Sequence, residues 1–345
     1  MKIGIIGLPG SGKTTVFEAL THNIQAASGR KGEPRIAVVK VPDGRVDALS
    51  RMYDPQKTTY AQVEYFLPPN PPSENRTANR SNIWDFVKDC DALIHVIRNF
   101  GVYGLEAPTP HKDFLQMDEE LILSDLMVVE KRLERIASDQ KRGKKLNPRE
   151  LSLLEQCRDT LEGTTSLREI PEISDAKELK GYALLSAKPM LVLFNNSEED
   201  ESLPQVDGFA SMENLVVVRG SLEHELAQLS EEESKGFFQE FDISASAMDR
   251  VIQRSYSLLG LVSFFTYGSD EVRAWTIKKS TTALDAAEVI HSDIKKGFIR
   301  AEVLAYDDLV AAGNFQQARK AGTVRLEGKT YEVKDGDIIT FRFNV

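Results

Sequence analysis

Eight residues near the N-terminus have the types and the spacing of a phosphate-binding loop. Residues 7–14 read Gly-Leu-Pro-Gly-Ser-Gly-Lys-Thr and match the pattern G-x-x-x-x-G-K-[ST] at every fixed position. In such a loop the glycines allow backbone N–H groups to surround phosphate oxygens, and the helix that follows adds the positive end of its dipole. We therefore expect a nucleotide polyphosphate to bind here. The motif predicts binding more strongly than it predicts hydrolysis.

Two side chains of this loop have predicted chemical roles. Lys13, the first catalytic candidate, would reach the β- and γ-phosphates, and the Thr14 hydroxyl would be a ligand of Mg²⁺. The residues expected to contact the nucleotide here are Gly7, Pro9, Gly10, Ser11, Gly12, Lys13, Thr14 and Thr15. A glycine turn with an incidental lysine is the alternative, and the elements predicted on either side argue against it.

Those elements predict the fold that positions the loop. Residues 2–6 form an apolar run typical of a buried strand, and residues 15–21 carry apolar side chains at helical spacing. Further strands are predicted at 35–41, 60–67, 92–97, 190–194 and 215–218, with helices between them. Strands that alternate with helices after a phosphate-binding loop predict an α/β fold with a mainly parallel, doubly wound sheet.

A helical hairpin is predicted inside this α/β region. Residues 118–140 are charged and carry apolar residues in a 3-4-3 spacing, and a basic turn follows at 141–145. Asn147 and Pro148 then have the order of a helix start, a capping residue followed by proline. We expect two antiparallel helices that pack on each other along apolar stripes.

The last part of the chain predicts a separate α+β module. From residue 261 onward, short strands and turns replace the long elements, with one small helix at 283–290. Strands are predicted there at 297–303, 322–326 and 338–345. The predicted domains are 1–117 with 167–260 for nucleotide binding, 118–166 for the helical hairpin, and 261–345 for the C-terminal module.

The composition is that of an ordinary globular protein in a reducing compartment. The 345 residues are 41% hydrophobic and 28% charged, and the net charge of −10 argues against a general attraction to nucleic acid. Cys90 and Cys157 lack the spacing of a zinc site, and no apolar stretch approaches the ~18 residues of a membrane helix. The short N-terminal apolar run does not have the features of a signal peptide. We expect a cytoplasmic protein with no membrane association and no sequence-specific DNA binding.

Several segments resemble the YchF-type, or Obg-like, ATPase family. They are residues 7–9 in the phosphate-binding loop, 195–198 after a strand, and 259–261, 264–266, 271–276, 286–287, 290–293, 296–301, 327–329 and 335–337 in the C-terminal part. The resemblance covers most of the chain. It implies a Ras-like nucleotide-binding domain, an inserted helical hairpin and a C-terminal TGS-like β-grasp domain. It also implies a cytosolic ATP-binding protein that associates with ribosomes.

The base-recognition segment, residues 195–198, reads Asn-Asn-Ser-Glu where a guanine-specific site has N-K-x-D. The Asp of that motif accepts two donors on the guanine edge, whereas Glu198 is one methylene longer and the lysine is missing. The family carries N-x-x-E here and prefers ATP, which implies Asn195 and Glu198 as base-site residues; a polar loop after a strand is the alternative. Ser221 lies where such folds place a second base-contacting loop. The expected ligands are ATP or ADP with Mg²⁺, and GTP is less favoured.

Other family motifs are missing or displaced, which bears on hydrolysis. The family has Asp-x-x-Gly at the end of its third strand, whereas an ungapped alignment places Leu67 and Asn70 there with two prolines between them. A proline supplies no N–H to a phosphate. The threonine expected before the second strand is absent from residues 29–34, and Thr58 and Thr59 lie beyond that strand.

The histidine that the family is thought to use for hydrolysis is also displaced. The loop at 101–110 has no histidine, which leaves His111, out of register by several residues, as the second catalytic candidate. His95 lies within the preceding strand and is predicted to be a packed core residue. Because loss of a transition-state group commonly costs a factor of about 10² to 10³, we infer slow or lost hydrolysis.

Three functions fit the sequence. The first is an ATP-binding, ribosome-associated regulator of translation with weak or lost hydrolysis, or else an active ATPase or GTPase of the same family. The second is a scaffold in which the nucleotide is structural. The third is a small-molecule kinase, because residues 10–14 resemble the loops of metabolite kinases, although an arginine-rich lid is missing. The C-terminal module offers a basic face for ribosomal RNA, or an ordinary solvated surface, at Lys278, Lys279, Lys295, Lys296 and Arg300.

Overall fold

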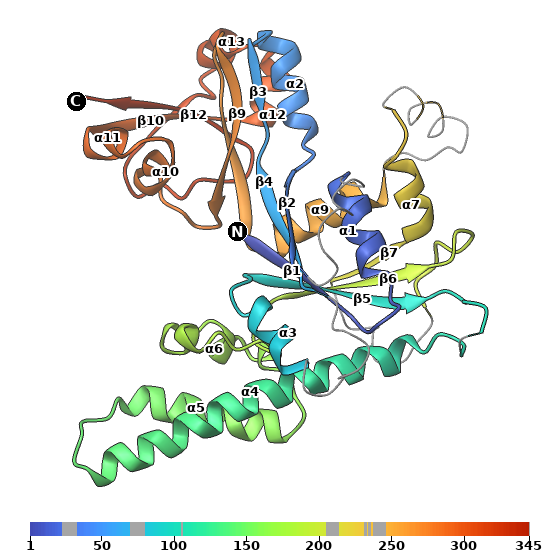
Figure 1. Cartoon of the computed structure of the whole chain (residues 1–345). Helices are drawn as coiled ribbons and strands as arrows, with labels where there is room; N and C mark the ends of the chain where they lie inside the picture. The colour runs from blue at the N-terminus through green and yellow to red at the C-terminus, as the bar shows by residue number, and fades with distance from the viewer. Residues whose placement is uncertain are drawn as a thin grey trace. The chain divides into compact units, whose positions relative to one another are not determined.

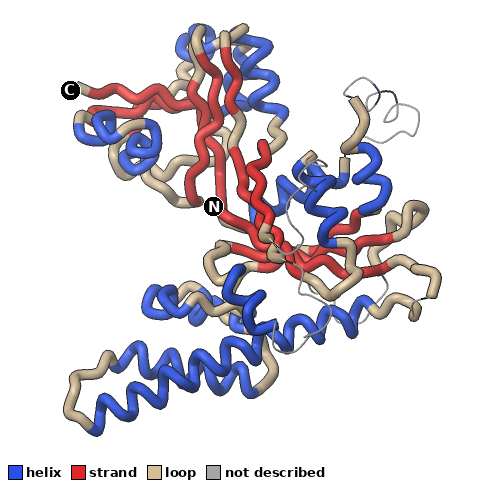
Figure 2. The backbone as a smooth tube through the Cα atoms, in the orientation of Figure 1, coloured by secondary structure: helices blue, strands red, loops and turns tan. Residues whose placement is uncertain are grey.

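The computed structural model describes residues 1–22, 33–69, 80–104, 106–204, 214–230, 233, 236 and 246–344. The chain forms two compact units, and each is made of two separate stretches of sequence. Unit 1 contains Met1–Val38 and Glu64–Val251, and unit 2 contains Val39–Val63 and Ile252–Val345. Each unit is built around a β-sheet (Figures 1 and 2).

The sheet of unit 1 has six strands in the order β2-β4-β1-β5-β6-β7. Their bounds are β1 Lys2–Ile6, β2 Arg35–Lys40, β4 Gln62–Leu67, β5 Ala92–Asn99, β6 Met190–Asn196 and β7 Leu215–Val218. β1 pairs in parallel with β4 and β5, and β6 pairs in parallel with β5 and β7. Parallel strands covered on both faces are expected to be nearly continuous apolar runs, as β1, β5 and β6 are. The predicted mainly parallel α/β fold is confirmed.

The position of β1 in this sheet determines where a ligand can bind. β1 lies between β4 and β5, so the strand order reverses on its two sides. In open α/β sheets, ligands bind outside the carboxyl ends of the strands at such a switch point. The loop after β1 leads directly into helix α1, Lys13–Thr21, whose apolar face is buried. The fold thus places the predicted phosphate-binding loop at the switch point.

The strand predicted at 60–67 is confirmed as β4, which begins two residues later, at Gln62. A separate short strand, β3 at Lys57–Thr59, precedes it. β3 pairs in parallel with β9, Glu271–Lys278, so that Thr58 lies opposite Val272 in the sheet of unit 2. The sequence pattern did not show this because the partner strand is far away in the chain. Thr58 and Thr59 are therefore strand residues of unit 2.

The predicted helical hairpin is confirmed, with a longer first helix. Helix α4 spans Pro110–Lys141 and helix α5 spans Pro148–Glu162 (Figure 1). α4 begins before residue 118 because proline is favoured in the first turn, where its missing N–H is not needed. Arg132 on α4 pairs with Glu150 on α5 at 2.6 Å. The apolar residues buried in and around the hairpin include Ile122, Val129, Ile136, Leu154, Cys157 and Leu161.

A buried carboxylate fixes α4 to the chain that enters β6. Asp125 is 2% exposed and accepts hydrogen bonds from the backbone N of Leu185 (2.8 Å), the backbone N of Ser186 (2.7 Å) and the Ser186 hydroxyl (2.6 Å). The other helices of this region are α3 Arg80–Val87, α6 Pro171–Ser174, α7 Gly220–Leu226 and α9 Ala247–Leu258. Within the described ranges, no helix is both long and apolar enough to cross a membrane.

The sheet of unit 2 has the strand order β11-β10-β12-β8-β9-β3. The strands not yet given are β8 Leu261–Thr266, β10 Phe298–Ala305, β11 Arg325–Glu327 and β12 Asp337–Phe343. The prediction of one small helix after residue 261 is wrong, because four short helices are present: α10 Ala283–Ile290, α11 Ser292–Lys296, α12 Tyr306–Ala312 and α13 Phe315–Lys320. The helix predicted at 283–290 is α10, and the Thr282 hydroxyl caps it by accepting from the Asp285 N–H.

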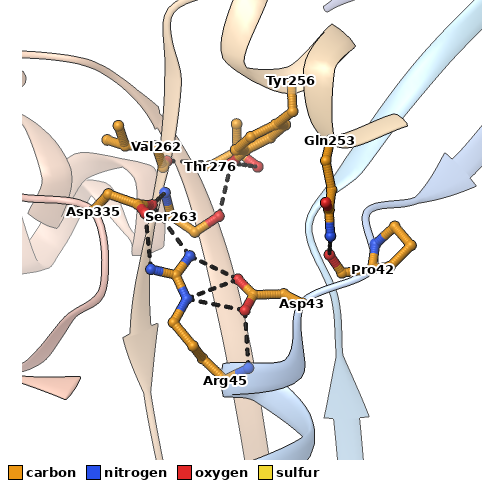
Figure 3. A network of polar contacts seen from close by, with 9 residues as sticks. All are labelled: Pro42, Asp43, Arg45, Gln253, Tyr256, Val262, Ser263, Thr276 and Asp335. Carbon is orange, nitrogen blue, oxygen red and sulfur yellow. Dashed lines mark hydrogen bonds and ion pairs between the residues drawn. The ribbon is translucent and has the colours of Figure 1, made fainter. Parts of the chain in front are cut away.

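Residues 39–63 belong to unit 2, although the sequence grouped them with the nucleotide-binding domain. They contain helix α2, Gly44–Tyr53, whose first turn is capped by Asp43. Figure 3 shows the Arg45 guanidinium between two carboxylates: it donates to Asp43 at 2.8 and 2.9 Å and to Asp335 at 2.8 Å. Asp335 also accepts from the backbone N of Ser263 at 2.8 Å. This network fastens the early segment to the C-terminal sheet.

The same network raises the pKa of Arg45. Burial lowers the pKa of Arg45, but its hydrogen bonds to Asp43 and Asp335 outweigh burial and raise the pKa above its usual value. The guanidinium therefore stays charged at every pH at which the protein is folded. A permanently charged donor that contacts two carboxylates is a strong, oriented connection.

Candidate nucleotide-binding site

The backbone of the phosphate-binding loop needs glycine at two positions. Gly7 has φ of +152°, and a Cβ added there would lie 2.4 Å from the carbonyl oxygen of Val96 on β5. Gly12 has φ of +91° at the N-terminus of α1, and a Cβ there would lie 2.1 Å from the Asn195 side-chain amide. Both glycines allow the loop to approach neighbouring strands closely, which a larger side chain would prevent.

Lys13 lies over the loop as its motif predicts. Its ammonium donates hydrogen bonds to the carbonyl oxygens of Gly7 at 2.8 Å and Leu8 at 2.9 Å. Burial lowers the pKa of Lys13 to about 8. The ammonium is therefore charged at neutral pH and is held by neutral carbonyl groups, which leaves its charge available to a phosphate.

The rest of the predicted loop residues surround this lysine. Pro9 and Gly10 are exposed at the tip, and Thr14 and Thr15 are half-buried in the first turn of α1. The Ser11 side chain is 1% exposed, and its hydroxyl has no hydrogen-bond partner among the residues that the structure describes. A bound phosphate would be an acceptor of the kind that this hydroxyl lacks.

Asn195 connects the phosphate-binding loop to the loop after β7. Its side-chain amide donates to the Ser11 carbonyl oxygen at 3.1 Å, and its side-chain oxygen accepts from the Gly220 N–H at 2.9 Å. The residue is 4% exposed. A Cβ at Gly220 would lie 2.5 Å from the Asn195 oxygen. The structure thus brings Asn195 to the phosphate-binding loop, as a tie between two loops.

Asn196 is a structural residue of the site that the sequence reasoning missed. It is 3% exposed, accepts from the Asn99 side chain at 2.9 Å, and donates to the carbonyl oxygens of Asp200 (3.1 Å) and Ser202 (2.8 Å). These bonds shape the loop that carries Glu198. The sequence does contain a signal for this role, a second asparagine at the end of a buried strand. A buried side-chain amide needs several hydrogen-bond partners, which indicates a structural role.

The other two predicted base-site residues are placed at the surface. Glu198 is exposed on the loop after β6, and its carbonyl oxygen accepts from Arg219 at 3.4 Å. Ser221 is exposed in α7, one residue beyond Gly220. Both side chains are accessible to a ligand, and their contact with a base stays a prediction.

Among the residues that the structure describes, the metal side of the site offers one ligand, the Thr14 hydroxyl. At the position where the family motif has its Asp, Leu67 is an apolar residue 4% exposed at the end of β4, and two prolines follow it. Asn70 and residues 29–32 lie outside the described part of the chain. No group of three or more His, Cys, Asp or Glu side chains suited to a metal occurs among the described residues. This donor set does not fit a tightly held Mg²⁺.

The two histidines near the site differ in position. His111 lies in the first turn of α4, and its catalytic role stays a prediction. His95 is 1% exposed inside β5, and its ring stacks on Phe114 with centroids 5.8 Å apart. The prediction that His95 is a packed core residue is confirmed.

Comparisons with known proteins agree with this geometry. A family model named YchF-GTPase_C, described as a protein of unknown function (DUF933), matches residues 261–344. The chain is 36% identical to the ribosome-binding ATPase YchF of Bacillus subtilis (strain 168) over 99% of each chain. It is 38% identical to the protein of the same name from Haemophilus ducreyi, over 100% of this chain and 99% of that one.

A solved structure is similar over nearly the whole chain. The Schizosaccharomyces pombe YchF GTPase superposes with a TM-score of 0.82 and 28% identity, over 99% of this chain and 97% of that chain. A GTP-binding protein from Pyrococcus horikoshii OT3, with a TM-score of 0.58 and 18% identity, shares the fold.

Proposed function

The chain belongs to the YchF family, and we propose that it binds an adenine nucleotide between β1 and α1 and hydrolyses it slowly or not at all. The observation that carries the binding function is the pair of hydrogen bonds made by Asn195 to Ser11 and Gly220. They connect the phosphate-binding loop to the predicted base loops through the protein's own hydrogen bonds. A preorganised pocket loses less conformational entropy when it binds.

The preference for adenine is proposed from the base loop. A guanine site needs an aspartate and a lysine, and here the lysine position holds the inward-facing Asn196. Glu198 is one methylene longer than aspartate, so its carboxylate is displaced from the position that accepts the two guanine donors. We propose that ATP and ADP bind more tightly than GTP, with Ser221 beside the base.

Slow hydrolysis is proposed from the end of β4. Leu67 cannot orient a metal-bound water molecule, and the two prolines that follow it remove two N–H donors and stiffen the loop. Each missing transition-state contact reduces the rate by a factor of about 10² to 10³. Lys13 remains, and we expect it to contribute mainly to binding.

The ribosome is the proposed partner, because the relatives are named ribosome-binding ATPases. We propose that the C-terminal TGS-like part contacts ribosomal RNA and that the protein acts in the cytoplasm. Lys295 pairs with Asp285 and Glu288, and Lys296 pairs with Asp293. These carboxylates therefore offset part of the positive charge of the predicted basic face. Lys278, Lys279 and Arg300 make no ion pair within the described ranges, and they are the cations we assign to RNA contact.

Two measurements on nucleotide test the proposal. Calorimetric titration with ATP, ADP and GTP should show ATP binding at least about tenfold tighter than GTP, a difference of about 1.4 kcal/mol. Tighter binding of GTP would contradict the base assignment. Phosphate release by the wild type should be close to that of Lys13→Ala, and robust turnover that disappears in Lys13→Ala would contradict slow hydrolysis.

Co-sedimentation with ribosomes tests the partner. The double variant Lys278→Glu/Lys279→Glu should sediment less with ribosomes than the wild type, and the difference should shrink at higher salt, because added salt weakens the phosphate contacts that the wild type makes. Lys177→Glu/Lys180→Glu is the control, since it makes the same charge change at exposed positions of unit 1. Equal sedimentation of both double variants would refute the assignment of this surface.

A further inference from the structure

The phosphate-binding loop holds Lys13 over its own carbonyl oxygens, whereas the described part of the chain offers a single candidate ligand for a metal at this site. In P-loop NTPases a Ser or Thr of the loop and an Asp from a neighbouring strand hold Mg²⁺ together. Thr14 supplies the first of these groups. Because β1 lies between β4 and β5, the second group would come from the carboxyl end of one of these two strands.

Neither strand end carries a carboxylate. β4 ends in three buried residues followed by two prolines, namely Tyr65, Phe66, Leu67, Pro68 and Pro69. β5 ends in Arg98 and Asn99, a cation and an amide. The Asn99 amide is already bonded to Asn196. Mg²⁺ prefers carboxylate and water ligands, so these strand ends offer it no stabilisation beyond what water provides.

We propose that this protein binds the free polyphosphate of ATP or ADP as tightly as it binds the Mg²⁺ complex. The inference rests on the proposed nucleotide-binding function and deepens it, because it names the chemical form of the ligand. Coupling between two ligands is reciprocal: Mg²⁺ strengthens nucleotide binding only as much as the protein strengthens the binding of Mg²⁺ to the nucleotide. One hydroxyl group that replaces one water molecule changes that affinity little.

The protein's own groups neutralise the phosphate charge in this scheme. The Lys13 ammonium is held over the loop by the carbonyl oxygens of Gly7 and Leu8 at 2.8 and 2.9 Å. The loop N–H groups and the positive end of α1 add to it. These contacts reach the phosphates whether or not a metal is bound, so most of the affinity is independent of the metal.

The test is a titration of ATP and of ADP into the full-length protein by calorimetry, once with excess Mg²⁺ and once with EDTA. We expect the two dissociation constants for each nucleotide to agree within about threefold. A loss of more than about tenfold in EDTA would overturn the inference.

Two further readouts separate this inference from the proposed function. Mn²⁺, followed by electron paramagnetic resonance, should bind to the protein–nucleotide complex as tightly as to free nucleotide, and much tighter binding to the complex would overturn the inference. Lys13→Ala should bind nucleotide at least about tenfold more weakly in both media. If Lys13→Ala bound as well as the wild type, the proposed site would be wrong, and the metal inference would fall with it.

Discussion

His95 predicts that unit 1 is sensitive to acid. The residue is 1% exposed, and neither ring nitrogen has a hydrogen-bond partner among the described residues. Burial, helped by the positive charges of Arg168 and Lys13, lowers the pKa of His95 to about 3. The folded chain therefore keeps this ring neutral, and the unfolded chain takes up a proton first as the pH falls.

The size of the effect follows from the two pKa values. A histidine in an unfolded chain has a pKa of about 6.5, so between that pH and pH 3 the unfolded state binds one proton more than the folded state. The contribution of His95 to the free energy of unfolding is therefore fully present above about pH 6.5, and it is lost as the pH falls below that value. Between about pH 7.5 and about pH 5.5, His95 should reduce the free energy of unfolding by about 1.4 kcal/mol.

His95→Leu tests this prediction. The substitution removes the titrating group and two unpaired buried nitrogens, so the variant should be more stable than the wild type by about 1 kcal/mol at neutral pH. The difference should grow by about a further 1.4 kcal/mol at about pH 5.5. His22→Asn, which removes an exposed histidine of the same unit, is the control.

The chain provides a reporter for this experiment. It has two tryptophans, Trp84 in unit 1 and Trp275 in unit 2. Trp84 is buried in the same apolar cluster as Phe114, the ring on which His95 stacks. In a Trp275→Phe background, urea unfolding followed by fluorescence therefore reports unit 1. Equal losses of stability in the wild type and His95→Leu between the two pH values would refute the reasoning.

Three further predictions concern polar side chains with several partners. Asn195→Ala should weaken ATP binding by at least about tenfold in calorimetry, because the two loops lose their connection and the Gly220 N–H is left unpaired; unchanged affinity would contradict the proposed tie. Asp125→Ala should lower the free energy of unfolding in urea by about 2–4 kcal/mol, because three buried donors lose their acceptor. Arg45→Lys should destabilise unit 2 by about 1–3 kcal/mol, seen in Trp275 fluorescence, because an ammonium cannot bond both carboxylates as the guanidinium does. Arg51→Lys on the same helix is exposed and should have no such effect.

The sequence predicted what depends on local pattern. The phosphate-binding loop, the buried strands β1, β5 and β6, and the helical hairpin each have a motif or a period that is complete within a short segment. The sequence predicts only one of the four helices after β9. The other three have five to seven residues and show little periodicity. For two of these three helices, the local signal is a capping side chain: His291 precedes α11 and Asn314 precedes α13.

Contacts between distant segments could not be predicted in the same way. The motif predicted Asn195, but its bonds to Ser11 and Gly220 join two loops to β6, and only the sheet brings these segments together. β3 was not predicted, because nothing in its three residues indicates a partner strand in the last quarter of the chain. The pairing of Arg45 with Asp335 was missed for the same reason.

The division of unit 2 into two stretches of sequence has a consequence for how the protein is made. β3 and α2 leave the ribosome long before β9, the strand on which β3 pairs and which lies far later in the chain. Until β9 is made, the early segment therefore has no sheet to join, and its exposed strand edge is open to wrong partners. A chain truncated before residue 335 would also lack Asp335, the distant acceptor of Arg45. We expect the early segment to find its place in unit 2 only after the C-terminal sheet has been made.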